Sequence, residues 1–274
     1  MSEVAGETAS IAAADAPRTR ASLLADLQTL GVQPGMTLMV HASLSKLGWV
    51  AGGPVAVVLA LLDAVGESGT LAMPSFSGDL TEPSYWQHPP VPEGWHQIIR
   101  DETPAFDVAL TPTRMMGKVS DTFRIWPGTL RSSHPHVSVC ARGPLAQVIT
   151  ADHQLENSMG EGSPFARLYD AGAYVLQLGT DRNSCLHLAE FRSGLRGHIV
   201  QGAPIIEDGR RIWKVFSDLK FDDDSFPPVK AAFEASGAVK VGHIGSATSR
   251  LMPVRGLVDF AAEWFRAHPG TAEV

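Results

Sequence analysis

Apolar and polar positions in the first quarter of the chain follow a strand–helix–strand order. Ala21–Leu30 has the leucine spacing of a helix, and Thr37–His41 is a short apolar run typical of a buried strand. Pro54 then stands at the first position of an apolar helical segment that ends before Gly66, and Thr70–Met73 has the pattern of a second strand. Strands joined through helices in this way predict a parallel sheet covered by helices.

Segment 74–112 shows no sustained period of either kind. It is rich in proline and contains Trp86 and Trp95. A loop of this length inside a compact domain is either disordered or functional, and its aromatic residues argue against disorder. We therefore expect an insertion that covers a substrate site.

Beyond residue 112 the alternation of strand and helix patterns resumes. The predicted elements are strands at Val137–Cys140, Tyr174–Leu178 and within Ile205–Val215, and helices at Met115–Phe123, Leu145–Ile149 and Gly256–Ala267. No internal repeat is visible. We predict a single α/β domain over residues 21–274, with a mixed, largely parallel sheet flanked by helices.

Residues 1–20 are small, polar and rich in alanine, and we expect them to form a disordered tail. They lack the basic start and apolar core of a secretory signal. The longest apolar run, Val55–Leu62, is far shorter than the roughly 20 residues that span a bilayer. Because Cys140 and Cys185 are the only cysteines, no disulfide framework is indicated. These features predict a cytoplasmic protein without a membrane partner.

The charge balance excludes one class of partner. Asp and Glu number 29 against 22 Lys and Arg, a net charge of −7, and no stretch concentrates basic residues. Nucleic acid is therefore not expected as a partner, because its recognition depends on neutralising phosphates. A cationic ligand is compatible with the balance, and a homodimer is left open.

The stretch Asp181–Phe191, DRNSCLHLAEF, directly follows a predicted strand. Ser184 is an N-cap candidate, and His187 and Glu190 are three residues apart, so they share one face of the helix. Ligands of open α/β sheets bind beyond the carboxyl ends of strands, where His41 also stands. The pair is therefore a candidate acid/base dyad. A solvated pair in a first helical turn is the alternative.

Two other chemistries receive weaker support from the sequence. Cys185 lies two residues before His187, so the two would not face each other on a helix. A metal site needs three or four converging ligands, and the chain has neither HxxxH nor CxxC, only the weak pair His134 and His136. We expect no metal.

The loop after the first strand leads into a helix N-terminus, where free backbone N–H groups attract phosphates. This loop contains residues 42–48 followed by Gly52 and Gly53. It lacks the glycine patterns of a Walker loop or a dinucleotide fingerprint, so spacing alone supports phosphate binding only weakly, and a tight turn is the default interpretation.

Seven segments in a fixed order resemble the aminoglycoside 3-N-acetyltransferases. They are VHASLSKLGWVAGG (40–53), GTLAMPSFSGDLTEPSYWQHPPVPEGW (69–95), PAFDVALTPTRMMG (104–117), RSSHPHVSVCARG (131–143), GEGSPFARLY (160–169), LGTDRNSCLHLAEF (178–191) and VGHIGSATSRLMPVRGLVDFAAEWF (241–265). They cover nearly the whole chain after the N-terminal segment. The resemblance implies the antibiotic N-acetyltransferase fold. It is not the more widespread acetyltransferase fold, whose pyrophosphate motif, Q/R-x-x-G-x-G/A, this chain lacks.

The resemblance implies an antibiotic-resistance enzyme that transfers the acetyl group of acetyl-CoA to the 3-amino group of 2-deoxystreptamine aminoglycosides. His187 would be the general base in a direct attack within a ternary complex, since an imidazole suits proton uptake near neutral pH. Glu190 would orient it or bind a substrate ammonium, and His41 is a second candidate for acid/base or orienting work. The alternatives are acetylation of another amine metabolite, and a non-catalytic aminoglycoside- or CoA-binding protein.

The resemblance also implies residues for both ligands. The expected acetyl-CoA contacts are Ser43, Leu44, Ser45, Gly48, Ser132, His134 and Ser163. Aminoglycosides and other polyamines are polycations, so carboxylates should bind them, and the candidates are Asp79, Glu82, Asp107 and Asp181. The run Asp222–Asp224 is either a further substrate contact or a solvated turn. Hydroxyl or N–H groups of the Ser43–Ser45 segment are candidates for stabilising an oxyanion.

One position departs from the family pattern, because we expect a small hydroxyl residue where this chain has Cys185. A thiol there reopens a two-step route through an acetyl-cysteine. The helical spacing and the family chemistry both favour direct attack.

Overall fold

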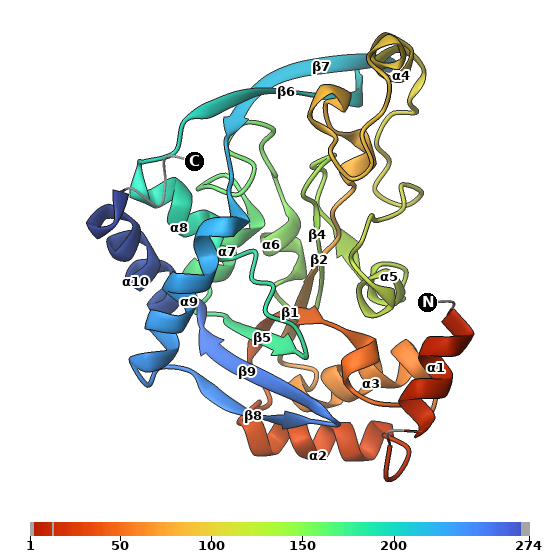
Figure 1. Cartoon of the computed structure of the whole chain (residues 1–274), viewed down its shortest axis with the longest axis vertical. Coiled ribbons are helices and arrows are strands. Elements are labelled where there is room, and N and C mark those ends of the chain that lie inside the picture. The colour runs from red at the N-terminus through yellow and green to blue at the C-terminus, as the bar shows by residue number, and fades with distance from the viewer. Residues whose placement is uncertain (1–2, 13, 270–274) are drawn as a thin grey trace.

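A seven-stranded mixed sheet runs through the middle of the protein in the computed structural model, which describes residues 3–12 and 14–269 (Figure 1). Its strand order is β3-β4-β2-β1-β5-β9-β8. The strands are β1 (Thr37–Ala42), β2 (Thr70–Pro74), β3 (Leu130–Arg131), β4 (Val139–Arg142), β5 (Tyr174–Leu178), β8 (Lys240–Ile244) and β9 (Ala247–Pro253). The central strands β2, β1 and β5 pair in parallel, and the outer pairs are antiparallel. The predicted α/β fold with a mixed sheet and flanking helices is confirmed, its parallel pairs lying at the centre.

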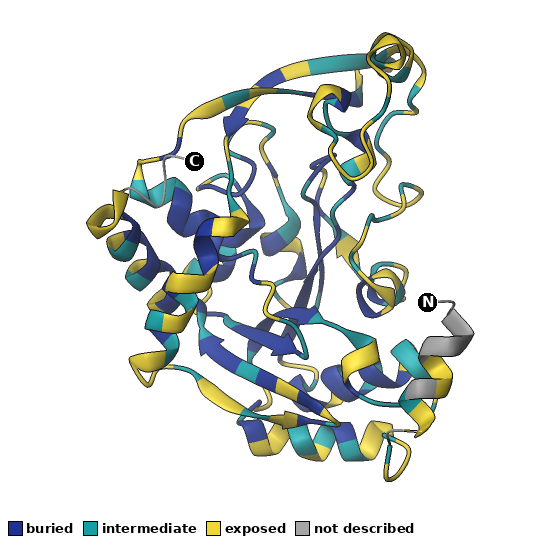
Figure 2. Ribbon diagram, in the orientation of Figure 1, coloured by how far each residue is buried: buried dark blue, intermediate teal, exposed yellow. Residues whose placement is uncertain are grey.

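Helices cover both faces of this sheet. One layer consists of α2 (Arg20–Leu30), α3 (Gly53–Val65) and α5 (Lys118–Arg124), and the other of α6 (Ala146–Thr150), α7 (Pro164–Asp170), α8 (Leu186–Ser193), α9 (Phe226–Ala235) and α10 (Val254–Ala267). Successive residues of β1 alternate between the two cores: Leu38 and Val40 pack with the first layer and Met39 with the second. The strands at the centre of the sheet are mostly buried (Figure 2). Burial on both faces explains why β1 is a continuous apolar run.

The ends of the first sheet-covering helix follow from local sequence. Thr19 and Ser22 form a capping box before α2, in which each side chain accepts a hydrogen bond from the other residue's backbone N–H. Gly31 ends the helix in the left-handed conformation, with φ of 106°. Among the described helices, none has both the length and the apolar character needed to cross a bilayer.

The segment before α2 differs from the disordered tail that the composition suggests. Residues 3–12 form helix α1, and Arg18 exchanges backbone hydrogen bonds with Trp49 and Ala51. The indole N–H of Trp49 donates to Glu7 Oε1 at 3.1 Å. Backbone groups paired in this way hold a terminus that composition alone would leave free. Residues 1, 2 and 13 of the expected tail lie outside the described residues.

A separate hairpin projects beyond the main sheet at the top of Figure 1. It consists of β6 (His198–Glu207) and β7 (Arg210–Leu219), and the short helix α4 (His96–Glu102) of segment 74–112 lies beside its turn. The sequence pattern predicts strands here, but only within 205–215, and it misses α4 entirely.

The insertion is anchored to this hairpin. The Phe106 N–H donates to Pro204 O at 2.9 Å, and the Arg211 guanidinium donates to Thr103 O at 3.1 Å. Of the insertion's residues, Pro74 and Phe76 line the cavity described below. The rest of the segment spans the distance between the sheet and the hairpin.

Arg131 fastens both ends of the insertion to the sheet. Its guanidinium donates to Ser75 O at 2.8 Å and Ser77 Oγ at 2.7 Å at one end, and to Thr111 O at 2.6 Å at the other. It also lies over the Phe106 ring, 4.9 Å from the centroid. Burial lowers its pKa to about 10, which leaves it charged at neutral pH.

We expect Arg131→Met to loosen the insertion, because it removes the donors but keeps a side chain of similar length. Unsatisfied acceptors should lower the free energy of unfolding by about 1–3 kcal/mol. Hydrogen–deuterium exchange should accelerate at 75–77 and 106–111. Arg210→Met, at an exposed arginine of β7, is the matched control. Equal exchange in the two variants would contradict this anchoring role.

Candidate active site

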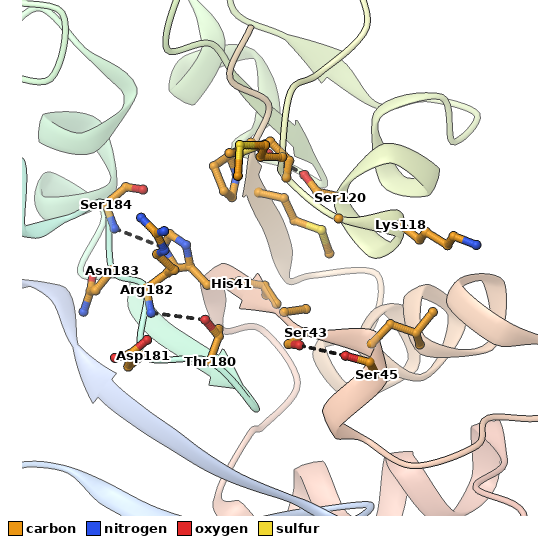
Figure 3. A pocket seen from close by; sticks show the side chains of 18 of the residues that line it. His41, Ser43, Ser45, Lys118, Ser120, Thr180, Asp181, Arg182, Asn183 and Ser184 are labelled. Atoms are coloured by element: carbon orange, nitrogen blue, oxygen red, sulfur yellow. Dashed lines mark hydrogen bonds between the residues drawn. The ribbon is translucent and has the colours of Figure 1, made fainter. Parts of the chain in front are cut away.

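A cavity of about 1260 Å³ lies beyond the carboxyl ends of the central parallel strands. Its walls include His41 at the end of β1, Met73 at the end of β2 and the loop 180–184 that follows β5. Residues of neighbouring helices complete it, among them Glu7 of α1 and Lys118 at the start of α5. Lys118 is labelled in Figure 3. This is the position at which open α/β sheets bind ligands.

His187 is held between two carboxylates at this cavity. Its Nδ1 lies 2.6 Å from Glu190 Oε2, one helical turn along α8, and its Nε2 lies 3.0 Å from Asp223 Oδ1. The i and i+3 spacing therefore produces the predicted contact. Aromatic rings of Phe221 and Phe226 pack against the imidazole, with centroids 5.0 and 4.9 Å away.

Glu190 is completely buried, and its carboxylate has several polar partners. Its Oε1 lies 2.9 Å from Arg196 Nε and accepts the Asp222 backbone N–H at 3.1 Å. Arg196 is itself buried, and it also donates to Ser225 Oγ at 2.7 Å. A carboxylate removed from water needs such partners to stay ionised.

Burial lowers the pKa of His187, but its hydrogen bonds to Asp223 and Glu190, together with their negative charges, outweigh burial and raise the pKa to about 9. The pKa of Asp223 is lowered in return, first by the hydrogen bond from His187. At neutral pH the unliganded site therefore holds an imidazolium between two carboxylates.

His41 is in the opposite state. It is buried at the end of β1, and its Nε2 accepts the Ser184 backbone N–H at 3.3 Å, the dashed line beside His41 in Figure 3. Burial lowers its pKa to about 3, and the positive charges of His187 and Arg182 act in the same direction. Two histidines that share one cavity thus have pKa values on opposite sides of neutrality.

The predicted acetyl-CoA residues fall into two groups. Ser43, Leu44, Ser45 and Gly48 all line the cavity. Ser43 Oγ and Ser45 Oγ are 3.4 Å apart on the loop after β1 (Figure 3).

Ser132, His134 and Ser163 are not among the cavity's lining residues. The Ser132 hydroxyl is 2.9 Å from His153 Nδ1, and His134 Nε2 lies 3.2 Å from Leu155 O. Ser163 caps α7 through its side chain. All three are buried, so their polar atoms stabilise the fold around them.

The structure does not bring Asp79 and Glu82 to the cavity. Asp79 pairs with Arg114, and Glu82 lies 2.6 Å from Arg100 Nη2. The insertion supplies its own cations for these carboxylates, which a pattern of acidic residues alone does not reveal.

Asp107 also lies elsewhere, where it accepts the backbone N–H groups of Ala109 and Leu110 at 2.8 Å and so closes a turn. Asp181 does line the cavity, as do Asp223 and Asp224 of the acidic run.

Cys185 lies outside the cavity lining, in the apolar core beneath α8. It is fully buried, and burial raises the pKa of its thiol to about 12. It also occupies the N-cap position of α8 that the sequence analysis gives to Ser184. The thiolate needed for nucleophilic catalysis is strongly disfavoured at such a place.

Residues 39–266 match the family model described as aminoglycoside 3-N-acetyltransferase. The chain belongs to this acetyltransferase family. The prophage-derived aminoglycoside N(3')-acetyltransferase-like protein YokD of Bacillus subtilis (strain 168) is 48% identical over 252 residues, covering 91% of this chain and 93% of the relative. The YokD crystal structure superposes with a TM-score of 0.94 at 44% identity, over 96% of this chain and 98% of its own.

Two further acetyltransferase structures carry ligands. AAC-IIIb, solved as a binary complex with CoASH, has a TM-score of 0.81 and 31% identity, covering 92% of this chain and 98% of its own. AAC-VIa, solved with bound sisomicin, has a TM-score of 0.82 and 28% identity, covering 92% and 99%. The predicted family and enzyme class, an acyltransferase, are confirmed.

Sequence reasoning missed part of this acetyltransferase site. Arg196 was not singled out, although a buried Glu190 requires a cation nearby. The run Asp222–Asp224 is predicted as either a substrate contact or a solvated turn, because nothing in its sequence indicates that Asp223 contacts His187 of α8.

We expect Asp223→Asn to lower the pKa of His187 by about 1 to 3 pH units, because an opposite charge next to the imidazolium is removed. A titration of the His187 ring by NMR measures this. Asp224→Asn is the matched control, since it removes a neighbouring charge of the same cavity for which no contact to His187 is found among the described residues.

The same variant should change the pH dependence of stability. Because the folded pKa of His187, about 9, lies above its unfolded value of about 6.5, the bound proton stabilises the fold fully below pH 6.5 and less as pH rises through 9. The stability difference between wild type and Asp223→Asn should therefore shrink over that range. A constant difference, with an unmoved His187 titration, would contradict the pairing.

Proposed function

We propose that this acetyltransferase transfers the acetyl group of acetyl-CoA to the 3-amino group of a 2-deoxystreptamine aminoglycoside, by direct attack in a ternary complex. The observation that carries the proposal is the His187–Glu190 pair at the cavity wall, with Nδ1 2.6 Å from the carboxylate. Nδ1 is thereby fixed as a donor, which leaves Nε2 as the nitrogen that can exchange a proton with substrate.

An amine attacks only with its lone pair free, so a proton must leave it. Once His187 has lost its own proton, Nε2 can accept one from the amine, and the imidazolium formed is stabilised by Glu190. Asp223 now lies where that amine would enter, 3.0 Å from Nε2. Its half-exposed side chain can turn to the substrate's cationic groups instead.

The pantetheine arm of acetyl-CoA is assigned to the loop after β1. Ser43, Leu44, Ser45 and Gly48 form one wall of the cavity that His187 also lines. The two ligands would thus meet between the ends of neighbouring strands. The CoA complex of AAC-IIIb and the sisomicin complex of AAC-VIa support this pair of ligands through their shared fold.

A different amine metabolite is the second candidate, and the cavity's charges favour it. The charged residues of the cavity wall include Glu7, Asp181, Asp223 and Asp224, but also Lys118, Arg182 and Lys230. Arg182 lies 3.1 Å from Asp223, and Lys230 donates to Asp181 O at 3.0 Å. Such a balanced wall suits a substrate with fewer positive charges than an aminoglycoside.

A thiol-release assay with acetyl-CoA distinguishes the candidates. Gentamicin-, kanamycin- and neomycin-type aminoglycosides are compared with small mono- and diamines. Release with an aminoglycoside is expected, with a rate that rises with pH toward about 9, because His187 must first lose its proton. Release with small amines alone would establish the second candidate, and no release with any amine would overturn the proposal.

His187→Ala should lower kcat by about 10²–10⁴-fold, the usual contribution of a general base. His243→Ala, at an exposed histidine of β8, is the matched control. An undiminished rate in His187→Ala would remove His187 from the role of base.

Cys185→Ser tests direct attack against an acetyl-cysteine route. Because the thiol is buried away from the cavity, turnover should stay within a few-fold of wild type. The free energy of unfolding should fall by about 1–3 kcal/mol, since a hydroxyl enters an apolar core. A loss of turnover of several orders of magnitude in a folded variant would restore the cysteine as nucleophile.

A further inference from the structure

We propose that His41 donates a hydrogen bond from its Nδ1–H to the thioester carbonyl oxygen of acetyl-CoA and so stabilises the negative charge that develops there. The inference rests on the proposed acetyl transfer, and it assigns to His41 an electrophilic role distinct from the acid/base work of His187.

The hydrogen bond from Ser184 defines the tautomer of His41. The backbone N–H of Ser184 points at Nε2, 3.3 Å away, so this nitrogen presents a lone pair. A neutral imidazole carries one proton, and with Nε2 accepting, the proton sits on Nδ1. The loop between β5 and α8 thereby turns His41 into a donor at its other nitrogen.

Nδ1 is available to a ligand. Within the described part of the chain it has no hydrogen-bond partner, and the His41 side chain lines the cavity. Nδ1 is not fully buried, so a ligand in the cavity can reach it. An N–H group that reaches a cavity and has no protein acceptor is suited to a ligand oxygen.

The surroundings keep His41 neutral throughout the working pH range. Burial at the end of β1 disfavours a charged ring, and the positive charges of His187 and Arg182 act in the same direction. The Ser184 N–H donates to Nε2 and so occupies the lone pair that a second proton would need. A neutral donor polarises a carbonyl without transferring its proton. Adjacent histidines of unlike protonation state are an arrangement that separates an electrophile from a base.

The position of His41 matches the reaction. It precedes the Ser43–Ser45 loop assigned to the pantetheine arm, and β1 pairs with β5 through His41 and Gln177. His187 is the second residue of α8, the helix after β5, so the amine and the thioester would approach from adjacent strand ends.

The step then balances as follows. The amine lone pair forms a bond to the carbonyl carbon, and the carbonyl π pair moves to the oxygen that faces His41 Nδ1–H. His187 Nε2 takes the proton from the amine nitrogen. The oxygen pair returns to reform the carbonyl, the C–S bond breaks, and the proton passes from His187 to the departing thiolate of CoA.

The carbonyl stretch of bound acetyl-CoA tests the contact before any chemistry occurs. With [1-¹³C]acetyl-CoA and no amine, the infrared band should lie at lower frequency on wild type than in solution. His41→Phe should bind acetyl-CoA by calorimetry but return the band to its solution position. An unchanged band in His41→Phe would overturn the inference. Failure of wild type to bind acetyl-CoA would overturn the proposed function with it.

Substitution by amides locates the donor atom. The amide nitrogen of Asn reaches the position of His Nδ1, whereas that of Gln reaches the position of Nε2. Loss of an oxyanion donor lowers kcat by about 10²–10³-fold, so His41→Phe and His41→Gln should fall by that factor with little change in KM for acetyl-CoA. His41→Asn should recover much of the rate. Recovery by Gln and not by Asn would overturn the assignment of Nδ1.

¹⁵N NMR of the His41 ring in the wild-type protein tests the tautomer without any substitution. The ¹⁵N shifts of His41 should show a protonated Nδ1 and an unprotonated Nε2 from pH 6 to 9, while His187 titrates in the same spectra. A His41 that gains a second proton in this range, or that carries its proton on Nε2, would contradict the inference. His243→Phe, on the exposed edge strand β8, is the kinetic control.

Discussion

The buried carboxylate of Glu190 is the constraint around which the site is built. It has no access to water, yet it holds the imidazole of His187 on one oxygen and the guanidinium of Arg196 on the other. Arg196 in turn contacts Asp222 and Ser225, so the loop that carries Asp223 is tied to the same carboxylate. Stabilising one buried charge therefore also places the acidic loop at the mouth of the cavity.

Much of the architecture could be predicted because it rests on local pattern. Thr37–Ala42 is a nearly continuous buried run because helices cover both faces of its strand, and Gly53–Val65 is mostly apolar because it packs on one face of the sheet. The edge strand β8, its neighbour β9 and helix α9 are not predicted, since their exposed positions interrupt the apolar period. Helix α9 also has two prolines in its first turn, where proline is tolerated, but two successive prolines in a sequence also indicate a loop.

The same distinction applies to the site: contacts set by local spacing could be predicted, and contacts between distant segments could not. His187 and Glu190 were predictable because a helix brings i and i+3 together, and His41 because strand ends converge. The ion pairs that Arg100 and Arg114 form with Glu82 and Asp79 could not be predicted from sequence spacing. An ion pair between segments that are far apart in sequence depends on the fold. The sequence therefore does not reveal that these carboxylates pair with arginines of the same chain and not with a ligand.

Helix α1 contributes residues to the wall of the cavity. Glu7 and Ser10 stand on the cavity wall, and the indole of Trp49 holds Glu7 there, yet the residues matched by the family model begin only at 39. His41, His187 and Glu190 thus lie within the residues matched by the family model, whereas part of the cavity wall is supplied by a segment that precedes them. Substitutions in helix α1 can therefore change which ligands the cavity admits without altering any of those three residues.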